Sequence, residues 1–158
     1  MSVRRLLFTT VLAAGLSAST LAAPAYAADR RDLSTLMTGW QVAGSPGDSN
    51  AWGAANVRVR PNKKQLCYTL FVSRRVDGVV NAAHIHAGAW GQIGPEKVVL
   101  AAPVNGWSSG CTTVAENLAR DIVQNPRQYH LDVHSTAFPN GPAIRGQLQR
   151  QNSNSNSH

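Results

Sequence analysis

The 158-residue chain lacks most of the short motifs that assign a chemistry directly. It contains only two cysteines, Cys67 and Cys111, and no C-x-x-C pair, which argues against a dithiol redox site or a zinc ribbon. It also contains no G-x-S-x-G sequence, no phosphate-binding loop and no H-E-x-x-H sequence. Glu96 and Glu116 show no recognisable pairing for glycoside cleavage. These absences favour a non-catalytic protein and leave an enzyme as the less favoured alternative.

Acidic residues are also scarce. The chain has 8 of them against 15 lysines and arginines, which gives a formal net charge of +7 at pH 7. The positive charges lie in scattered pairs such as Lys63-Lys64 and Arg74-Arg75, and no dense basic run is interleaved with aromatic residues. This pattern argues against nucleic acid as a partner. Ordinary solubility explains the charge, with loose attraction to an anionic cell wall or polysaccharide as the alternative.

A long apolar segment is present only near the start of the chain. Residues 6–16 are mostly apolar, Arg4 and Arg5 precede them, and Ala25-Tyr26-Ala27 supplies small residues two apart. This is the pattern of a secretory signal peptide cut after Ala27. The segment is short for a membrane-spanning helix and contains Gly15. We therefore expect residues 1–27 to be removed and the mature protein to be extracellular, without a transmembrane segment.

Export bears on the two cysteines, because an isolated cysteine pair outside the cytoplasm usually forms a disulfide. We expect a bridge between Cys67 and Cys111, which would hold the intervening segment in place. The polar segment QNSNSNSH (151–158) is of low complexity, and we expect it to be disordered. One domain over 28–150 remains.

Short segments of alternating apolar and polar residues fill that domain. Alternation predicts a hairpin over 56–73 and further strands at 38–44, 83–87, 97–101, 111–114, 129–134 and 144–148. Leu118 and Ile122 lie four apart in a segment that Pro126 ends, which predicts a short helix near 115–125. The fold class expected is all-β, an antiparallel β-sandwich of the immunoglobulin-like or superoxide-dismutase-like Greek-key kind.

Three segments in this order resemble the CHRD (chordin-type) domain family: AAHIHAGAWGQIGP (82–95), YHLDVHSTAFPNG (129–141) and AIRGQL (143–148). The resemblance covers most of residues 33–150. It implies an extracellular β-sandwich, and it does not transfer the growth-factor antagonism of chordin, which depends on other modules.

The histidines are the residues most suggestive of chemistry. Successive side chains on a strand point to opposite faces, so His84 and His86 share one face, and His130, Asp132 and His134 share a face of a later strand. If the two strands are neighbours, His84, His86 and His134 form a site suited to one copper or zinc ion. Asp132 and His130 would then be extra ligands or would orient an imidazole.

A structural role is the competing interpretation. Histidine donates and accepts hydrogen bonds, so His84 and His86 could brace the glycine-rich loop 88–95. Copper/zinc superoxide dismutases also combine an H-x-H strand, a later V-H strand and an arginine, here Arg145. Residues 87–110 contain no histidine or aspartate, so only a mononuclear site is conceivable.

Arg145 either pairs with Asp132, the favoured interpretation, or binds an anion.

Two hypotheses about function follow. The favoured one is a non-catalytic extracellular binding or structural module with an unknown extracellular or cell-surface partner. The alternative is a copper or zinc metalloprotein, with potential redox activity. Four tryptophans could form a carbohydrate-stacking face, but packing in the core or against loops is the default for this residue: Trp40, Trp52, Trp90 and Trp107.

Overall fold

The computed structural model describes residues 31–151, so the predicted signal peptide and nearly all of the predicted disordered tail lie outside the described residues. The strands are β1 (Arg31–Thr38), β2 (Trp52–Arg60), β3 (Gln65–Val72), β4 (Val80–Ala87), β5 (Glu96–Leu100), β6 (Trp107–Thr113), β7 (Tyr129–Ser135), β8 (Ile144–Gln147) and β9 (Gln149–Arg150). One α-helix, α1 (Glu116–Gln124), lies between β6 and β7, and short 3-10 turns cover Gly39–Gln41, Pro61–Lys63 and Pro126–Gln128.

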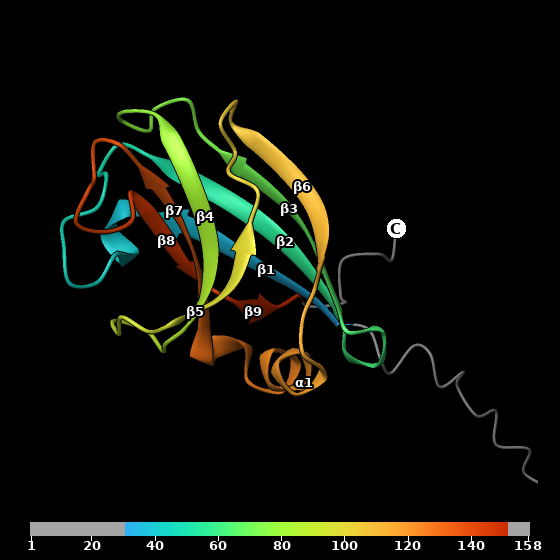
Figure 1. Ribbon diagram of the computed structural model, residues 1–158. Coiled ribbons are helices and arrows are strands. Elements are labelled where there is room, and N and C mark those ends of the chain that lie inside the picture. The colour runs from blue at the N-terminus through green and yellow to red at the C-terminus, as the bar shows by residue number, and fades with distance from the viewer. Residues whose placement is uncertain (1–30, 152–158) are drawn as a thin grey trace, which may run out of the picture.

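The strands form one antiparallel sheet in the order β5-β4-β7-β8-β1-β2-β3-β6, with β9 beside β1. The sheet curls, so that its two edge strands, β5 and β6, come near each other (Figure 1). The Tyr68 hydroxyl accepts a hydrogen bond from the Ala101 backbone N–H at 2.7 Å, and the Ser108 hydroxyl donates to the Ala101 carbonyl at 2.8 Å. The predicted all-β antiparallel class is confirmed. One sheet that nearly closes on itself replaces the expected pair of stacked sheets, because β8 and β1 pair and join the two halves.

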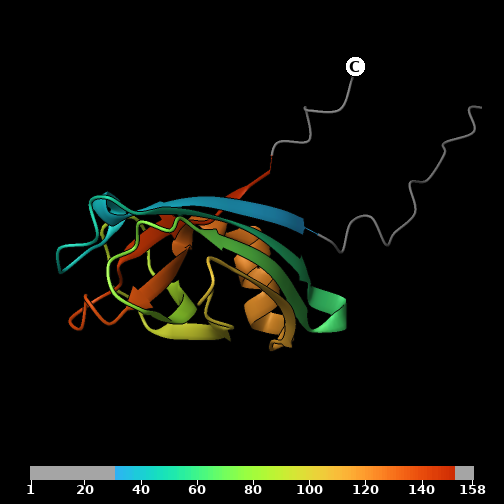
Figure 2. The same ribbon diagram turned by 90° about the horizontal axis from the view of Figure 1, so that it is seen from above.

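Strand alternation determines which side chains enter the core. Ile85 of β4 and Leu131 and Val133 of β7 are fully buried inside the curled sheet. The residues that alternate with them along each strand, including Asp132 and the histidines, therefore point to the outer face. Helix α1 lies across one end of the curled sheet (Figures 1 and 2). Its residues Ala119 and Ile122 are buried, and the predicted helix is confirmed.

The first strand lies earlier than the sequence indicated. A strand was expected at 38–44, but β1 ends at Thr38 and a 3-10 turn follows. Leu36 points outward between the buried Thr35 and Met37, and this exposed leucine obscures the alternation. Gly39 begins the turn because a β-carbon there would lie 2.0 Å from the Asp48 carbonyl oxygen.

Cys67 and Cys111 face each other across β3 and β6 and form the predicted disulfide. Among residues 31–151, no helix has the length and apolar character needed to cross a membrane.

Candidate metal centre

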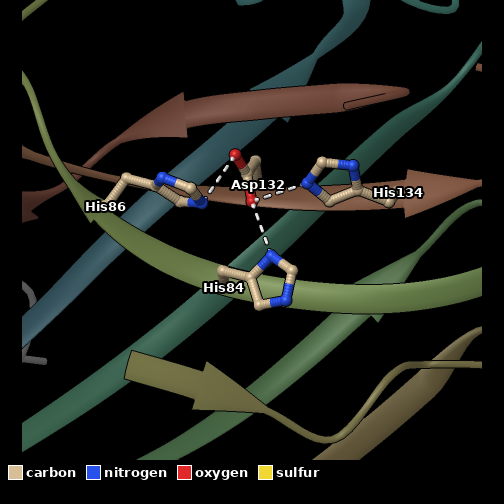
Figure 3. Close-up of side chains that lie close together, drawn as sticks. All are labelled: His84, His86, Asp132 and His134. Carbon is tan, nitrogen blue, oxygen red and sulfur yellow. Dashed lines mark ion pairs between the residues drawn. The ribbon is translucent and has the colours of Figure 1, made fainter. Parts of the chain in front are cut away.

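Four side chains from β4 and β7 converge on the outer face of the sheet, as Figure 3 shows: His84, His86, Asp132 and His134. The strand register produces this convergence, because Asp132 lies directly opposite His84 in the antiparallel pair. The partner of His134 in the register is Ala82, and this small residue leaves room for the His134 ring to lie 5.2 Å from the His84 ring. Alternation thus placed the correct residues on one face, and the register brings them together.

The distances between the converging atoms suit a single small cation. Asp132 Oδ1 lies 3.7 Å from His84 Nδ1 and 3.4 Å from His134 Nε2, and Asp132 Oδ2 lies 3.4 Å from His86 Nε2. Ligand atoms about 2.1 Å from a tetrahedral ion are separated by about 3.4 Å. The four ligand atoms lie within 4.8 Å of one another, so the longer separations would contract when an ion binds.

The facing atoms have no hydrogen-bond partner. His84 Nδ1, His86 Nε2, His134 Nε2 and Asp132 Oδ1 are all buried, and none of them makes a hydrogen bond among the described residues. Asp132 is 3 % exposed although it lies on the outer face of the sheet. Buried polar atoms are normally paired, and leaving one unpaired costs about 1–3 kcal/mol. These four unpaired atoms at one point therefore form a polar cluster that a cation could complete.

The tautomer of His86 is fixed by the loop 88–95. His86 Nδ1 lies 2.8 Å from the Gly94 carbonyl oxygen, which can only accept, so Nδ1 carries the proton and donates it. When the ring carries this one proton, Nε2 is a lone pair that faces the Asp132 carboxylate. A lone pair and a carboxylate repel each other unless a proton or a metal cation lies between them. One proton could remove this repulsion at one imidazole, whereas one metal ion would bind the lone pairs of all three imidazoles.

His84 has a comparable partner on its outer side. Its Nε2 lies 3.4 Å from Glu96 Oε2, so its other nitrogen, Nδ1, faces the centre. A carboxylate or carbonyl behind a ligating imidazole is the usual arrangement in metal sites, because it fixes the tautomer and raises the basicity of the ring. The sequence analysis did not identify Glu96 as a residue of this site. The feature that could have indicated it is its position at the start of the strand that pairs with the strand of His84 and His86.

The charges of the centre are interdependent. Burial alone would raise the pKa of the Asp132 carboxyl, but the interactions with His134 and His84 outweigh burial and hold this pKa well below its usual range. The Asp132 carboxylate in turn raises the pKa of His84, against the lowering effect of burial. The Asp132 carboxyl is thus ionised beneath the three imidazoles, where it favours either a proton on a ring or a cation between the rings.

His130 is not one of the converging residues. Its ring stacks on His86 with centroids 5.3 Å apart, and its Nδ1 lies 3.1 Å from the Gly88 carbonyl oxygen. Burial lowers the pKa of His130, so the ring is neutral and donates to Gly88. His130 therefore packs against His86 from outside the group of converging atoms. The expectation that His84 and His86 brace loop 88–95 is confirmed for His86, whereas His84 makes no bond to this loop among the described residues; His130 braces the loop as well.

The Asp132–Arg145 ion pair expected from the sequence is not formed among the described residues. Arg145 is buried and donates instead to the backbone carbonyls of Gln92 at 2.7 Å and Ala89 at 3.0 Å, while Asp132 faces the imidazoles. Its β8 neighbour Gln147 donates to the Gly88 carbonyl at 2.8 Å. Two side chains of β8 thus hold the loop whose Gly94 carbonyl fixes the His86 ring.

Comparison with known proteins gives one family match. The family model of the CHRD domain matches residues 33–148. The chain belongs to the CHRD domain family. No curated protein and no solved structure matches it. The matched CHRD residues include every member of the centre and Arg145, so the centre is part of the domain itself.

Proposed function

We propose that this protein is a secreted CHRD domain protein that binds one copper or zinc ion through His84, His86, Asp132 and His134. The observation that carries the proposal is the convergence of three imidazole nitrogens and one carboxylate oxygen, all buried and without hydrogen-bond partners. Three imidazoles with a carboxylate suit both metals.

The ligand count supports a non-catalytic role. Four protein ligands complete a tetrahedral shell, as in structural zinc sites, whereas catalytic zinc sites keep one position for water. We therefore propose that the metal ion has a structural and not a catalytic role, and that the protein is a non-catalytic binding module. This joins the two functions considered from the sequence, because a non-catalytic extracellular module can also contain a metal.

Secretion is supported by two independent features. The disulfide between Cys67 and Cys111 is typical of proteins outside the reducing cytoplasm. The pattern of residues 1–27 is that of a cleaved signal peptide. N-terminal sequencing of exported protein is expected to begin at Ala28.

Measurement of the metal content tests the proposed metal site. The mature protein, purified without an affinity tag and titrated with copper or zinc, is expected to retain about one equivalent, and His134→Ala is expected to retain far less. His158→Ala is the matched control, because His158 lies outside the described residues and in no proposed site. Equal metal retention by wild type and His134→Ala, or no retention by either, would contradict the proposal. Far-ultraviolet circular dichroism establishes that both variants are folded.

A further inference from the structure

The outer face of β1, β2, β3 and β6 carries two rows of side chains that run across the strands. In the first, which we call the apolar row, each residue is the register partner of the next: Leu36, Ala54, Phe71 and Trp107. In the second, the polar row, the residues are paired in the same way: Ser34, Asn56, Thr69 and Ser109. The two rows are neighbours because their members lie two apart on each strand.

The large members of the apolar row are open to solvent. Trp107 is 58 % exposed, Leu36 57 % and Phe71 42 %. Trp52, 46 % exposed, contacts Phe71 with ring centroids 5.2 Å apart. The expectation was that the tryptophans pack in the core or against loops, and Trp52 and Trp107 do not lie in the core. Single exposed apolar residues are ordinary, but a contiguous aromatic group on one face marks an interaction site.

Both rows border one hollow. A depression of about 430 Å³ is lined by Leu36, Phe71 and Trp107 and by Asn56 and Thr69 of the polar row. Neither row contains an ionisable side chain. The next register pair along the strands, Asp32 and Arg58, forms an ion pair at 2.8 Å, so its charges largely cancel. The hollow is thus aromatic on one side, neutral and polar on the other.

These properties restrict the occupant. The ligand needs an apolar face to lie on the aromatic rings and neutral groups that exchange hydrogen bonds with amides and hydroxyls. A pyranose ring has both, since its C–H groups form a face and its hydroxyls form the rim. A charged polymer would find no opposite charge in either row. The rows cross four strands, about 14 Å at the usual strand spacing, which is long enough for more than one sugar unit.

We propose that this face binds an uncharged polysaccharide, with the sugar faces on Trp107 and Phe71 and the hydroxyls on Asn56 and Thr69. The site shares no residue with the metal centre, which lies on β4 and β7. The two activities are therefore separable.

Isothermal titration calorimetry of the mature protein in excess chelator tests this proposal without the metal. The probes are the neutral hexasaccharides cellohexaose, chitohexaose and maltohexaose, with hexagalacturonate as the acidic comparison. At least one neutral probe is expected to bind with 1:1 stoichiometry and to change tryptophan fluorescence. Trp107→Ala is expected to weaken binding roughly three- to tenfold, the effect of losing one aromatic contact.

Two variants serve as controls. Trp107→Tyr keeps an aromatic ring and is expected to bind within about twofold of wild type. Val99→Ala removes an exposed valine of β5, outside this face, and should leave binding unchanged. Circular dichroism establishes that each variant is folded.

Three results would overturn the proposal. The first is that no neutral probe binds, and the second is that hexagalacturonate binds at least as tightly. The third is a wild-type dimer in sedimentation velocity that Trp107→Ala separates, without saccharide binding, because the face would then be an interface between two copies.

Discussion

Asp132 lies beneath three imidazole rings, with its carboxylate almost fully covered. An aspartate on the outer face of a sheet would ordinarily be solvated, and here the rings of His84, His86 and His134 replace the water. None of the facing imidazole nitrogens makes a good hydrogen bond to the Asp132 carboxylate among the described residues. The carboxylate is therefore stabilised only by the nearness of the rings. A cation between the carboxylate and the rings would satisfy all four groups together.

Replacement of this carboxylate tests that role. Asp132→Asn keeps the shape of the side chain and removes the charge, and a neutral amide is a much poorer metal ligand. We expect the affinity for zinc or copper to fall by more than about 100-fold, beyond the 10- to 100-fold typical for the loss of an orienting partner. Competition titration with a chromophoric chelator measures the change. Asp121→Asn, on the exposed side of α1, is the control, and an equal loss in both variants would contradict a ligand role for Asp132.

A second residue-scale prediction concerns Tyr129, whose hydroxyl donates to the Asp121 carboxylate. Burial and this carboxylate raise the pKa of Tyr129. The same hydrogen bond, with that of Asn125, lowers the pKa of Asp121. The Asp121 contribution to stability is thus present above its ordinary pKa, near 4, and is lost on acidification. The Tyr129 contribution is present below about pH 10 and is lost as the pH rises.

Tyr129→Phe is therefore expected to lower the free energy of unfolding by about 1 kcal/mol, the contribution of one hydrogen bond. The difference from wild type should be largest between about pH 5 and 9 and should shrink at both extremes. Urea unfolding across the pH range measures it. A difference that stays constant from pH 3 to 11 would show that the loss comes from packing alone.

Prediction from sequence at this scale succeeded where a local rule was sufficient. The period of two along a strand placed His84 with His86, and Asp132 with His134, on one face. The exclusion of His130 could not be predicted, because it depends on the register that sets His130 opposite His86. Register is decided by pairing between strands far apart in the chain.

At the scale of elements, strand β8 links the candidate metal centre to the rest of the sheet. Arg145 and Gln147 project from β8 onto the carbonyls of loop 88–95, and this loop gives the Gly94 carbonyl to His86. Loops are ordinarily the mobile parts of a domain. Here a buried guanidinium holds the loop, so the imidazole that it orients is held as well.

Arg145→Met tests this coupling, because methionine fills similar space without the hydrogen bonds. Loss of two charge-assisted bonds from a buried group is expected to cost about 3 kcal/mol in stability and to weaken metal binding as well. Chemical unfolding and metal titration measure the two effects. Arg120→Met is the control, since Arg120 is exposed on α1 and pairs only with groups on the surface, and should cost less than about 1 kcal/mol. Normal metal affinity in Arg145→Met would contradict the coupling.

The elements themselves could largely be predicted from the sequence. The hairpin, the helix and the later strands follow from local alternation and from Pro126. The first strand was misplaced because the exposed Leu36 hides the buried face of β1. That leucine is explained by the apolar row of the outer face, which is a feature of four strands and not of one.

At the scale of the whole molecule, the disulfide and the metal centre lie in different halves of the curled sheet. Cys67 and Cys111 join β3 to β6, whereas the ligands come from β4 and β7. The disulfide and metal binding should therefore contribute independently to the free energy of unfolding.

Replacement of both cysteines by alanine tests this independence. A bridge between residues 44 apart in sequence is expected to contribute about 2–4 kcal/mol to the free energy of unfolding. The increase in melting temperature on adding zinc or copper should be the same with and without the bridge. Differential scanning calorimetry measures both effects, and a metal-induced increase that disappears with the bridge would contradict the independence of the two sites.

The near-closure of the sheet could not be predicted from the sequence. The class and strand positions follow from local patterns, but closure depends on the pairing of β8 with β1 and on bonds of Tyr68 and Ser108 to Ala101. Contacts of this kind join distant parts of the chain, and no local pattern encodes them.

The proposed metal ion is held by three histidines and one aspartate. Anomalous diffraction from crystals of the metal-loaded protein, collected at the absorption edge of zinc or copper, would locate this ion. We predict one strong peak about 2.0–2.2 Å from His84 Nδ1, His86 Nε2, His134 Nε2 and an Asp132 oxygen. A peak at any other place, or no peak in crystals grown with excess metal, would contradict a metal site at these residues and leave His86 with its bond to the Gly94 carbonyl alone.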